Sequence, residues 1–340
     1  MILTQSVTDG DVLPVPDVYF SSAYGAACEA ETGSTWVNLS DPDGDWQLPL
    51  LLAPISDASG RLDAASPYGY SGVYVRAGMP VSRQRALWEE SMRRLRQAGV
   101  VSLFLRHSQL VSGLDLEAVG PHVSVVSGHP TVAVDITDSH LMWDSLQGRT
   151  RTAIRKARKN GLSVQVRDFT LEDCGPGSAF RGLYETTMRR VEASPRYLFD
   201  HRYYGALLQG LGRDLQLVEV VDAAETVGAA AILMRSGPLL HYHLSGSDPV
   251  QARLGANNLM LWGAMEWAAA TEVKTFHLGG GVSSDDPLLK FKRSFGGREL
   301  AFNATGHVVD PRRYAALVAG RDFPAAEESG YFPAYRMRES

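Results

Sequence analysis

The residues best suited to chemistry lie together near the end of the chain, between Phe276 and Gly297. An apolar run ends there in three glycines, residues 279–281, and a basic group at 290–293 follows (Lys-Phe-Lys-Arg). Glycines tolerate positive φ angles and let a ligand approach backbone N–H groups closely. The pattern therefore predicts a strand end that binds a phosphorylated substrate. The alternative is that the glycines form a bulge and the basic residues face solvent.

A second concentration of positive charge lies between Ser145 and Arg167, where no acidic residue occurs. A basic helix that only faces water usually carries Glu or Asp four residues away for pairing. The segment therefore favours a polyanionic ligand held at one place, and a solvated face is the alternative. The net charge of −5 argues against a basic coat for binding duplexes. The basic residues between Ser145 and Arg167 are Arg149, Arg151, Arg155, Lys156, Arg158, Lys159 and Arg167.

Composition limits the class of protein. A chain of 340 residues with 44% hydrophobic and 21% charged residues is typical of two globular domains. Cys28 and Cys174 are too few for a disulfide framework or a thiolate zinc site, and no histidine pair has ligand spacing, so we expect no metal. With no signal-peptide pattern at the start and no apolar run of about 18–20 residues, we expect a cytoplasmic protein without membrane insertion.

Strands and helices alternate in the same order in both halves of the chain. The first half predicts strands at 46–54 and 68–75, a helix at 82–98 and a strand at 100–105. The second half predicts strands at 215–221, 227–234 and 239–246, a helix at 256–270 and a strand at 274–278. Tyr70 precedes Phe104 by the same number of residues as Tyr242 precedes Phe276. We therefore predict a structural duplication.

The remaining helices are predicted between and after these two sets. Two short helices should be broken near Gly148, the second ending at Asn160–Gly161; others cover 178–191, 200–211 and 311–318. We place the first domain at 1–145 plus 316–340 and the second at 146–315.

Five short motifs then occur in the order found in one protein family. They are Ser66–Gly72 (SPYGYSG), Phe104–His107 (FLRH), the basic helix after Trp143, Tyr242–Ser247 (YHLSGS), and Phe276–Gly281 with Phe291–Lys292. Over residues 45–315 the chain resembles the Fem-type tRNA-dependent aminoacyltransferases. It lacks a coiled-coil arm and so is most similar to the compact FemX type. One departure is Ser108–Gln109, where the family often has proline, and it bears on the acceptor side.

The resemblance implies an α/β fold of two tandem acetyltransferase-like (GNAT) domains, each a mixed twisted sheet flanked by helices, with a shared cleft. It implies transfer of an amino acid from aminoacyl-tRNA, as co-substrate, to the amine of a peptide, without a cofactor. The acceptor would be a peptidoglycan precursor, linked to a nucleotide or lipid, or a peptide natural product. An acyl-CoA-dependent N-acyltransferase and a non-catalytic binding module are the alternatives. The oligomeric state is left open.

The resemblance also implies site residues. Lys292 would contact the tRNA terminus or the developing charge, with Phe291 beside it and Tyr242 lining the transfer channel. For Phe291 and Tyr242, plain core packing is the alternative. In the first domain Tyr68, Tyr70 and Arg106 would surround the acceptor, with Arg106 suited to a phosphate or carboxylate; a plain aromatic strand is the alternative for the tyrosines.

The other predicted contacts are to phosphate. Gly279 and Gly280 would offer backbone donors. Arg253 and Asn257 lie where GNAT proteins place the loop that holds the coenzyme A pyrophosphate, although the motif is incomplete here. Arg155, Lys156 and Lys159 would bind the tRNA backbone or the diphosphate of the acceptor.

Overall fold

The computed structural model describes residues 2–4, 15–56, 60–116, 119–281, 286–319 and 331–337. The chain divides into two compact units: unit 1 is Met1–His129 with Ala301–Ser340, and unit 2 is Pro130–Leu300. Both boundaries lie about fifteen residues before the predicted ones. They fall inside two long strands, β7 (Val123–Asp135) and β13 (Arg298–Val308), so each strand contributes residues to both units.

Unit 1 is built on a mixed sheet. Its strands follow the order β1-β2-β3-β4-β6-β13, with β5 paired to β3. Only β4 and β6 are paired in parallel among them. The strands are β1 (Ile2–Thr4), β2 (Thr35–Ser40), β3 (Trp46–Pro54), β4 (Leu62–Ala65), β5 (Tyr74–Val75) and β6 (Val100–Arg106). The helices are α1 (Ser22–Thr32), α2 (Val81–Gln97) and α10 (Pro311–Ala319), with 3-10 turns at Val18–Phe20 and Ala334–Arg336.

The strands of unit 2 follow the order β7-β12-β11-β10-β9-β8, where β11 and β12 are parallel. The strands are β8 (Ser163–Asp168), β9 (Leu215–Val221), β10 (Val227–Ser236), β11 (Leu239–Ser247) and β12 (Thr275–Gly280). The helices are α3 (Ser139–Ser145), α4 (Gly148–Lys159), α5 (Ala179–Arg190), α6 (His201–Leu211), α7 (Pro249–Leu254), α8 (Ala256–Ala269) and α9 (Pro287–Arg293), with 3-10 turns at Glu172–Cys174, Pro195–Tyr197 and Gly212–Asp214.

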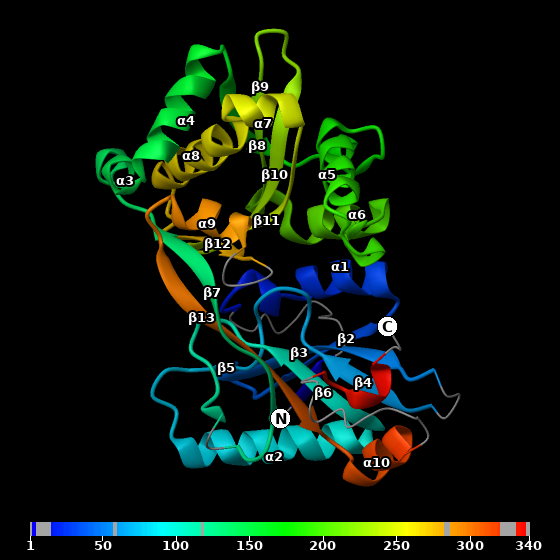
Figure 1. Ribbon diagram of the computed structural model, residues 1–340. Helices are drawn as coiled ribbons and strands as arrows, with labels where there is room; N and C mark the ends of the chain where they lie inside the picture. Colours follow the sequence, from blue (N-terminus) through cyan, green and yellow to red (C-terminus); the bar gives the residue numbers. More distant parts are fainter. Residues whose placement is uncertain are drawn as a thin grey trace. The chain divides into compact units, whose positions relative to one another are not determined.

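Helices cover both faces of the unit 2 sheet, with α4 and α8 on one face and α5 and α6 on the other (Figure 1). Helix α8 is apolar around most of its circumference, because it packs between the sheet and α4. Trp262, Met265 and Leu259 of this helix are buried in a core that also contains Phe276 of β12. This packing fixes the strands that carry the predicted site. Among the described helices, none combines the length and apolar character that a membrane span requires.

The predicted duplication is present, but one of its equivalences is wrong. In unit 2 Leu240 pairs with Phe276, and in unit 1 Ala65 pairs with Phe104, so the two phenylalanines are equivalent. Tyr242 lies on β11, two residues after Leu240, the partner of Phe276. Tyr70 lies in a loop, five residues after Ala65, the partner of Phe104, so the two tyrosines are not equivalent.

The loop around Tyr70 also explains why the strand predicted at 68–75 is wrong. Gly69 and Gly72 have φ angles of 110° and 66°, which an extended strand cannot accommodate. Only Tyr74–Val75 is a strand, and the unit 1 strand before it is β4, in a stretch whose sequence predicts a turn. The predicted α/β class, with mixed strand pairing and flanking helices, is confirmed.

Candidate functional site

The parallel strands of unit 2 separate where the predicted residues lie. β11 and β12 pair over three positions, ending at His241 and His277, and both strands then continue. Each strand also has a shift in register here. The pairing of β11 with β10 shifts between Tyr242 and Ser245, and the pairing of β12 with β7 shifts between His277 and Gly279. Bulges of this kind bend a strand and redirect its side chains. Beyond this point Tyr242 and Gly280 therefore lie on strand ends that are no longer paired with each other.

The alternation along β11 sends its side chains to two different layers. Tyr242 packs with Phe291 against the core that contains α8, whereas His241 contacts the ring of His277, with centroids 5.6 Å apart. His243 lies on the His241 side, where its Nε2 is 2.6 Å from the hydroxyl of Tyr203. Burial lowers the pKa of His243 to about 3, so this imidazole stays neutral.

Lys292 is the central polar group of this site. It lies on α9 with only 6% of its surface exposed, and its Nζ donates to the carbonyl oxygen of Gly280 at 2.7 Å. The ammonium is 5.9 Å from the ring centroid of Tyr242. Burial lowers its pKa to about 8, and the carboxylate of Asp286 opposes that shift. Near neutral pH such a lysine can stabilise an oxyanion as a cation or exchange a proton.

Tyr242 and Phe291 frame the lysine. Burial raises the pKa of Tyr242 to about 12, with a partly opposing hydrogen bond to Ser245, so the phenol keeps its proton. It can orient an oxygen or an amine but not act as a base at neutral pH. Phe291 meets Phe295 edge-on at 5.3 Å and packs against the core. These contacts fit the packing alternative for Phe291.

The backbone conformation and packing of β12 explain why Gly279 and Gly280 are glycines. Gly279 has a φ of 72° at the β12 bulge, and a Cβ at Gly280 would lie 3.0 Å from the carbonyl oxygen of Pro130. Both positions therefore need glycine for the bulge and for close backbone packing, as in the alternative interpretation. Residues 282–285 of the predicted loop lie outside the described residues.

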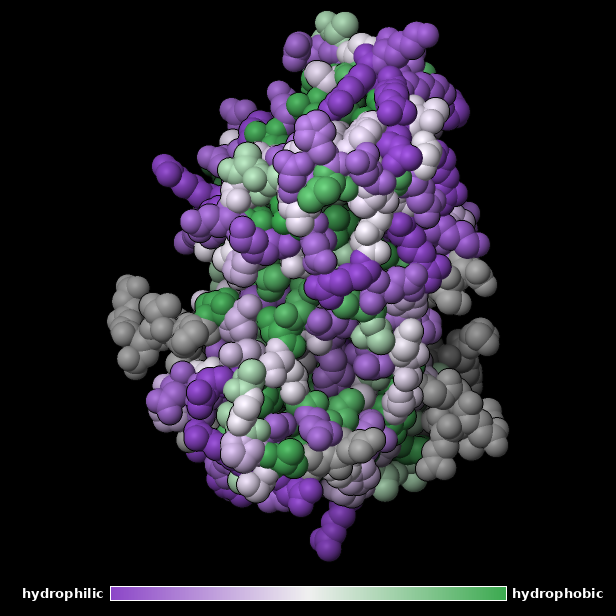
Figure 2. Space-filling view, turned by 90° about the vertical axis from the view of Figure 1, so that its left-hand side faces the viewer, coloured by the Kyte–Doolittle hydropathy of each residue, from purple (hydrophilic) through white to green (hydrophobic). Residues whose placement is uncertain are grey.

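Helix α4 presents the predicted basic residues to solvent, but several have protein partners. Arg155, Lys156 and Lys159 are exposed. The guanidinium of Arg155 lies 5.2 Å from the ring centroid of Trp143, and Lys156 donates to the carbonyl oxygen of Arg253 at 2.9 Å. Figure 2 faces the side on which α3 and α4 lie in Figure 1, and hydrophilic residues gather over its upper part.

Arg167 does not belong with this positive surface. Its guanidinium contacts Asp173 at 2.7 Å and Glu219 at 2.8 Å, which raises its pKa further. Arg158 likewise pairs with Glu266 at 3.1 Å. The acidic partners come from outside the segment that lacks acidic residues, so the local sequence overstated its net positive charge.

The loop at the start of α8 packs against α4. Gly255 has a φ of 99°, and a Cβ there would lie 2.4 Å from the carbonyl oxygen of Ala153. Asn257 donates to the hydroxyl oxygen of Ser247 at 3.2 Å. The structure thus brings Arg253 next to α4 and Asn257 next to the end of β11, whereas Lys292 contacts the end of β12.

The three predicted residues of unit 1 lie near one another within an aromatic cluster. Tyr70 contacts the rings of Tyr19 and Phe302 edge-on, at 5.8 and 5.5 Å. The guanidinium of Arg106 lies over Phe104 and donates to the carbonyl oxygen of Ser66 at 3.3 Å. Tyr68 is 44% exposed, while its carbonyl accepts from the hydroxyl of Tyr24.

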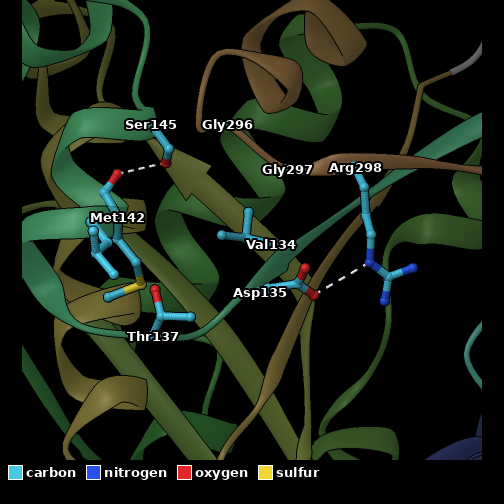
Figure 3. A pocket seen from close by; sticks show the side chains of 9 residues that line it. Val134, Asp135, Thr137, Met142, Ser145, Gly296, Gly297 and Arg298 are labelled. Atoms are coloured by element: carbon cyan, nitrogen blue, oxygen red, sulfur yellow. Dashed lines mark hydrogen bonds and ion pairs between the residues drawn. The ribbon is translucent and has the colours of Figure 1, made fainter.

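A surface pocket of about 320 Å³ in unit 2 is lined by none of the predicted residues. Figure 3 shows Asp135 and Arg298 side by side on its rim, 3.3 Å apart, with Met142 and Ser145 of α3 opposite. Gly296 has no room for a Cβ beside the hydroxyl of Ser145, so packing explains this glycine. The pocket is separate from the Lys292 site in its residues.

One group of carboxylates in unit 1 is close enough to hold a cation. Oxygens of Asp41, Asp43 and Asp45 lie within 4.8 Å of one another among the described residues. Asp41 pairs with Arg83 at 3.0 Å, and Asp45 pairs with Arg76 at 2.8 Å. These arginines balance the charge, and Asp41 also accepts the backbone N–H of Trp46, so the group is explained as a turn.

Comparison with known proteins places this geometry in a fold. Residues 148–293, from α4 to α9, match the profile of the acetyltransferase (GNAT) domain. No curated protein matches the chain. Solved structures do: the crystal structure of FemX aligns with 93% of this chain and 99% of its own, at 15% identity and a TM-score of 0.70.

Two further structures show the same fold at lower similarity. The C-terminal domain of a putative lysylphosphatidylglycerol synthetase from Agrobacterium fabrum covers 86% of this chain and 88% of its own, at 12% identity and a TM-score of 0.56. A tandem GNAT protein from the clavulanic acid biosynthesis pathway covers 82% and 85%, at 12% identity and 0.50. The chain therefore has the fold of FemX and of tandem GNAT proteins, and Lys292 lies inside the stretch that matches the GNAT domain.

Proposed function

We propose that the protein is an aminoacyltransferase that moves an amino acid from aminoacyl-tRNA to the amine of a peptide. The observation that carries this proposal is Lys292, a buried amine held on the Gly280 carbonyl beside Tyr242, where β11 and β12 separate. The ester of aminoacyl-tRNA is already activated. Alignment and charge stabilisation can therefore supply much of the rate without a nucleophilic triad.

The reaction needs one new bond, one broken bond and one proton transfer. The neutral amine of the acceptor attacks the ester carbonyl, forming the C–N bond and an oxyanion. Collapse breaks the C–O bond to the ribose, whose oxygen gains the proton that the amine loses. Protonated Lys292 would donate to the oxyanion or to the leaving oxygen, and Tyr242 would orient the reacting groups as a hydrogen-bond donor.

Helix α4 supports tRNA as the carrier rather than coenzyme A. GNAT proteins hold a pyrophosphate at the start of α8. Here Gly255, at that position, packs against Ala153 of α4, and Lys156 of α4 donates a hydrogen bond to the carbonyl oxygen of Arg253 just before it. The exposed Arg155 and Lys159 instead point to an extended phosphate backbone at the surface. The second candidate is an acyl-CoA N-acyltransferase, favoured by the acetyltransferase-domain match over 148–293.

A donor comparison distinguishes these functions. The protein is incubated with a mixture of charged tRNAs or with acetyl-CoA, and with a cell-wall nucleotide pentapeptide or short peptides bearing free amines. We expect product only from charged tRNA, and RNase treatment of the donor beforehand should abolish it. Product from acetyl-CoA would favour the second candidate, and the absence of product with either donor would leave a binding module.

The role of α4 is tested separately by binding. Changing Arg155 and Lys156 to alanine should weaken tRNA binding and reduce the salt slope by about one or less per charge removed. The matched control changes Arg189 and Arg202, exposed arginines of α5 and α6, to alanine. It should leave the tRNA affinity and its salt slope unchanged. If the α4 variant binds tRNA normally but loses the nucleotide-linked acceptor, the helix binds the acceptor's phosphates instead.

A further inference from the structure

Both ends of α9 contact the end of β12. At the start of the helix, the side chain of Asp286 lies so close to Gly281 that a Cβ there would be 2.7 Å from Oδ2. In the last turn, Lys292 donates to the carbonyl oxygen of the preceding residue, Gly280. Gly280, the last residue of β12, and Gly281 after it are thus met by a base and an acid from the two ends of one short helix.

Asp286 also determines where α9 begins. Its Oδ1 accepts the backbone N–H of Leu288 at 2.7 Å, and its carbonyl accepts that of Lys290 at 3.1 Å. Pro287 at the first helical position adds a fixed φ. One carboxylate oxygen therefore caps the helix while the other lies against the strand.

Three described groups interact with the Lys292 ammonium by charge or ring contact. Tyr242 of β11 offers an uncharged ring face, and burial and Lys292 both lower the pKa of His277 on β12, so that imidazole is neutral. Asp286 is the third, and its negative charge opposes the effect of burial on the lysine. Among these three groups, the carboxylate is therefore the one that favours the charged form of Lys292.

We propose that Asp286 is a positioning residue that sets α9 against β12 and keeps Lys292 protonated beside Gly280. Its consequence for catalysis rests on the aminoacyl transfer proposed above; its effect on Lys292 does not. Loss of the carboxylate would remove a negative charge that favours the ammonium form of Lys292. The amine would then lose its proton at a lower pH, and with it the ability to stabilise an oxyanion.

Two variants separate the charge of Asp286 from its capping role. Asp286→Asn keeps a side-chain oxygen for the cap and removes the charge, whereas Asp286→Glu keeps the charge and is a poorer cap. The whole protein labelled with [13C]lysine is titrated by NMR. The five lysines of the chain give few Cε signals, and Lys292→Met assigns the relevant one.

We expect the Lys292 signal to titrate near pH 8 in the wild type and at a lower pH in Asp286→Asn. Asp286→Glu should stay near the wild-type midpoint. An unchanged midpoint in Asp286→Asn, or an equal drop in Asp286→Glu, would overturn the proposal. The titration needs no donor, so its outcome stands whether or not aminoacyl transfer is found.

If transfer is found, its pH profile gives a second readout. The high-pH limb should move to lower pH in Asp286→Asn by the same amount as the Lys292 midpoint. A uniform loss of rate with an unmoved limb would contradict the charge role of Asp286.

Discussion

Replacing Lys292 with methionine should leave the protein at least as stable as the wild type at pH 7, although we expect it to slow transfer strongly. Burial lowers the pKa of this lysine from its ordinary 10.5 to about 8, which corresponds to about 3 kcal/mol of destabilisation of the folded state. The methionine variant loses the hydrogen bond to the Gly280 carbonyl, and an unpaired buried acceptor costs about 1–3 kcal/mol. The net change should lie between zero and about 2 kcal/mol of stabilisation.

The pH dependence isolates the electrostatic part of this change. Between pH 8 and 10.5 the unfolded chain still binds the proton that folded Lys292 has lost, so the wild type gains stability as the pH rises. The advantage of Lys292→Met should therefore be full below pH 8 and smaller by about 3 kcal/mol near pH 10.5. The lost hydrogen bond contributes a nearly constant offset.

Urea unfolding of both proteins at several pH values from 7 to 10 gives the difference directly. Lys290→Met, at an exposed lysine of the same helix, is the matched control and should show no such trend. The reasoning is refuted if the stability difference between Lys292→Met and wild type does not change with pH, or if the variant is several kcal/mol less stable at pH 7.

Two further substitutions test the packing of the units. His307 is buried, shares the Thr305 hydroxyl with His107, and has its pKa lowered by burial to about 3; its ordinary value is 6.5. As the pH falls from 6.5 to 5 the unfolded chain takes up a proton that folded His307 does not, so the wild type should lose about 2 kcal/mol from this residue. Urea unfolding at the two pH values should show that His307→Gln loses about 2 kcal/mol less stability than the wild type between pH 6.5 and pH 5. An equal loss in the two proteins would contradict this. Gly255→Ala should destabilise by at least about 2 kcal/mol, because φ is 99° and the Cβ meets the Ala153 carbonyl. Gly148→Ala, with nothing within 4 Å, should leave the melting temperature nearly unchanged, and equal melting of the two variants would sink the explanation.

Strong local signals made much of the fold predictable. The helices at 81–97 and 256–269 lie within one residue of their predicted ranges. Each has apolar residues at helical spacing, which are buried in the core of its own unit. β4 was not predictable, since its four residues become a strand only by pairing with β3 and β6. The Ser66–Gly72 motif misled for the opposite reason: its aromatic residues suit a strand, but two of its glycines adopt positive φ.

The candidate site was predictable only in part. The order of the motifs identified Lys292, Tyr242 and Gly280, which the structure brings together. Ser245 was missed because it meets Tyr242 through a bulge in β11, which alternation along a strand cannot reveal. Asp286 carried a usable signal, an Asp-Pro pair before an apolar-basic run, which is typical of a helix start. Glu219, one of the two acidic partners of Arg167, lies 52 residues along the chain and left no local trace.

The most direct test of the central claim is single-turnover transfer from radiolabelled aminoacyl-tRNA by wild type and Lys292→Met, with tRNA binding measured in parallel. We predict that the wild type forms a labelled amide product, and that the variant binds tRNA with similar affinity but transfers at least about 100-fold more slowly, as for loss of one oxyanion donor. Equal transfer rates in the two proteins would contradict the role of Lys292. A wild type that neither binds charged tRNA nor forms product would contradict the proposed function itself.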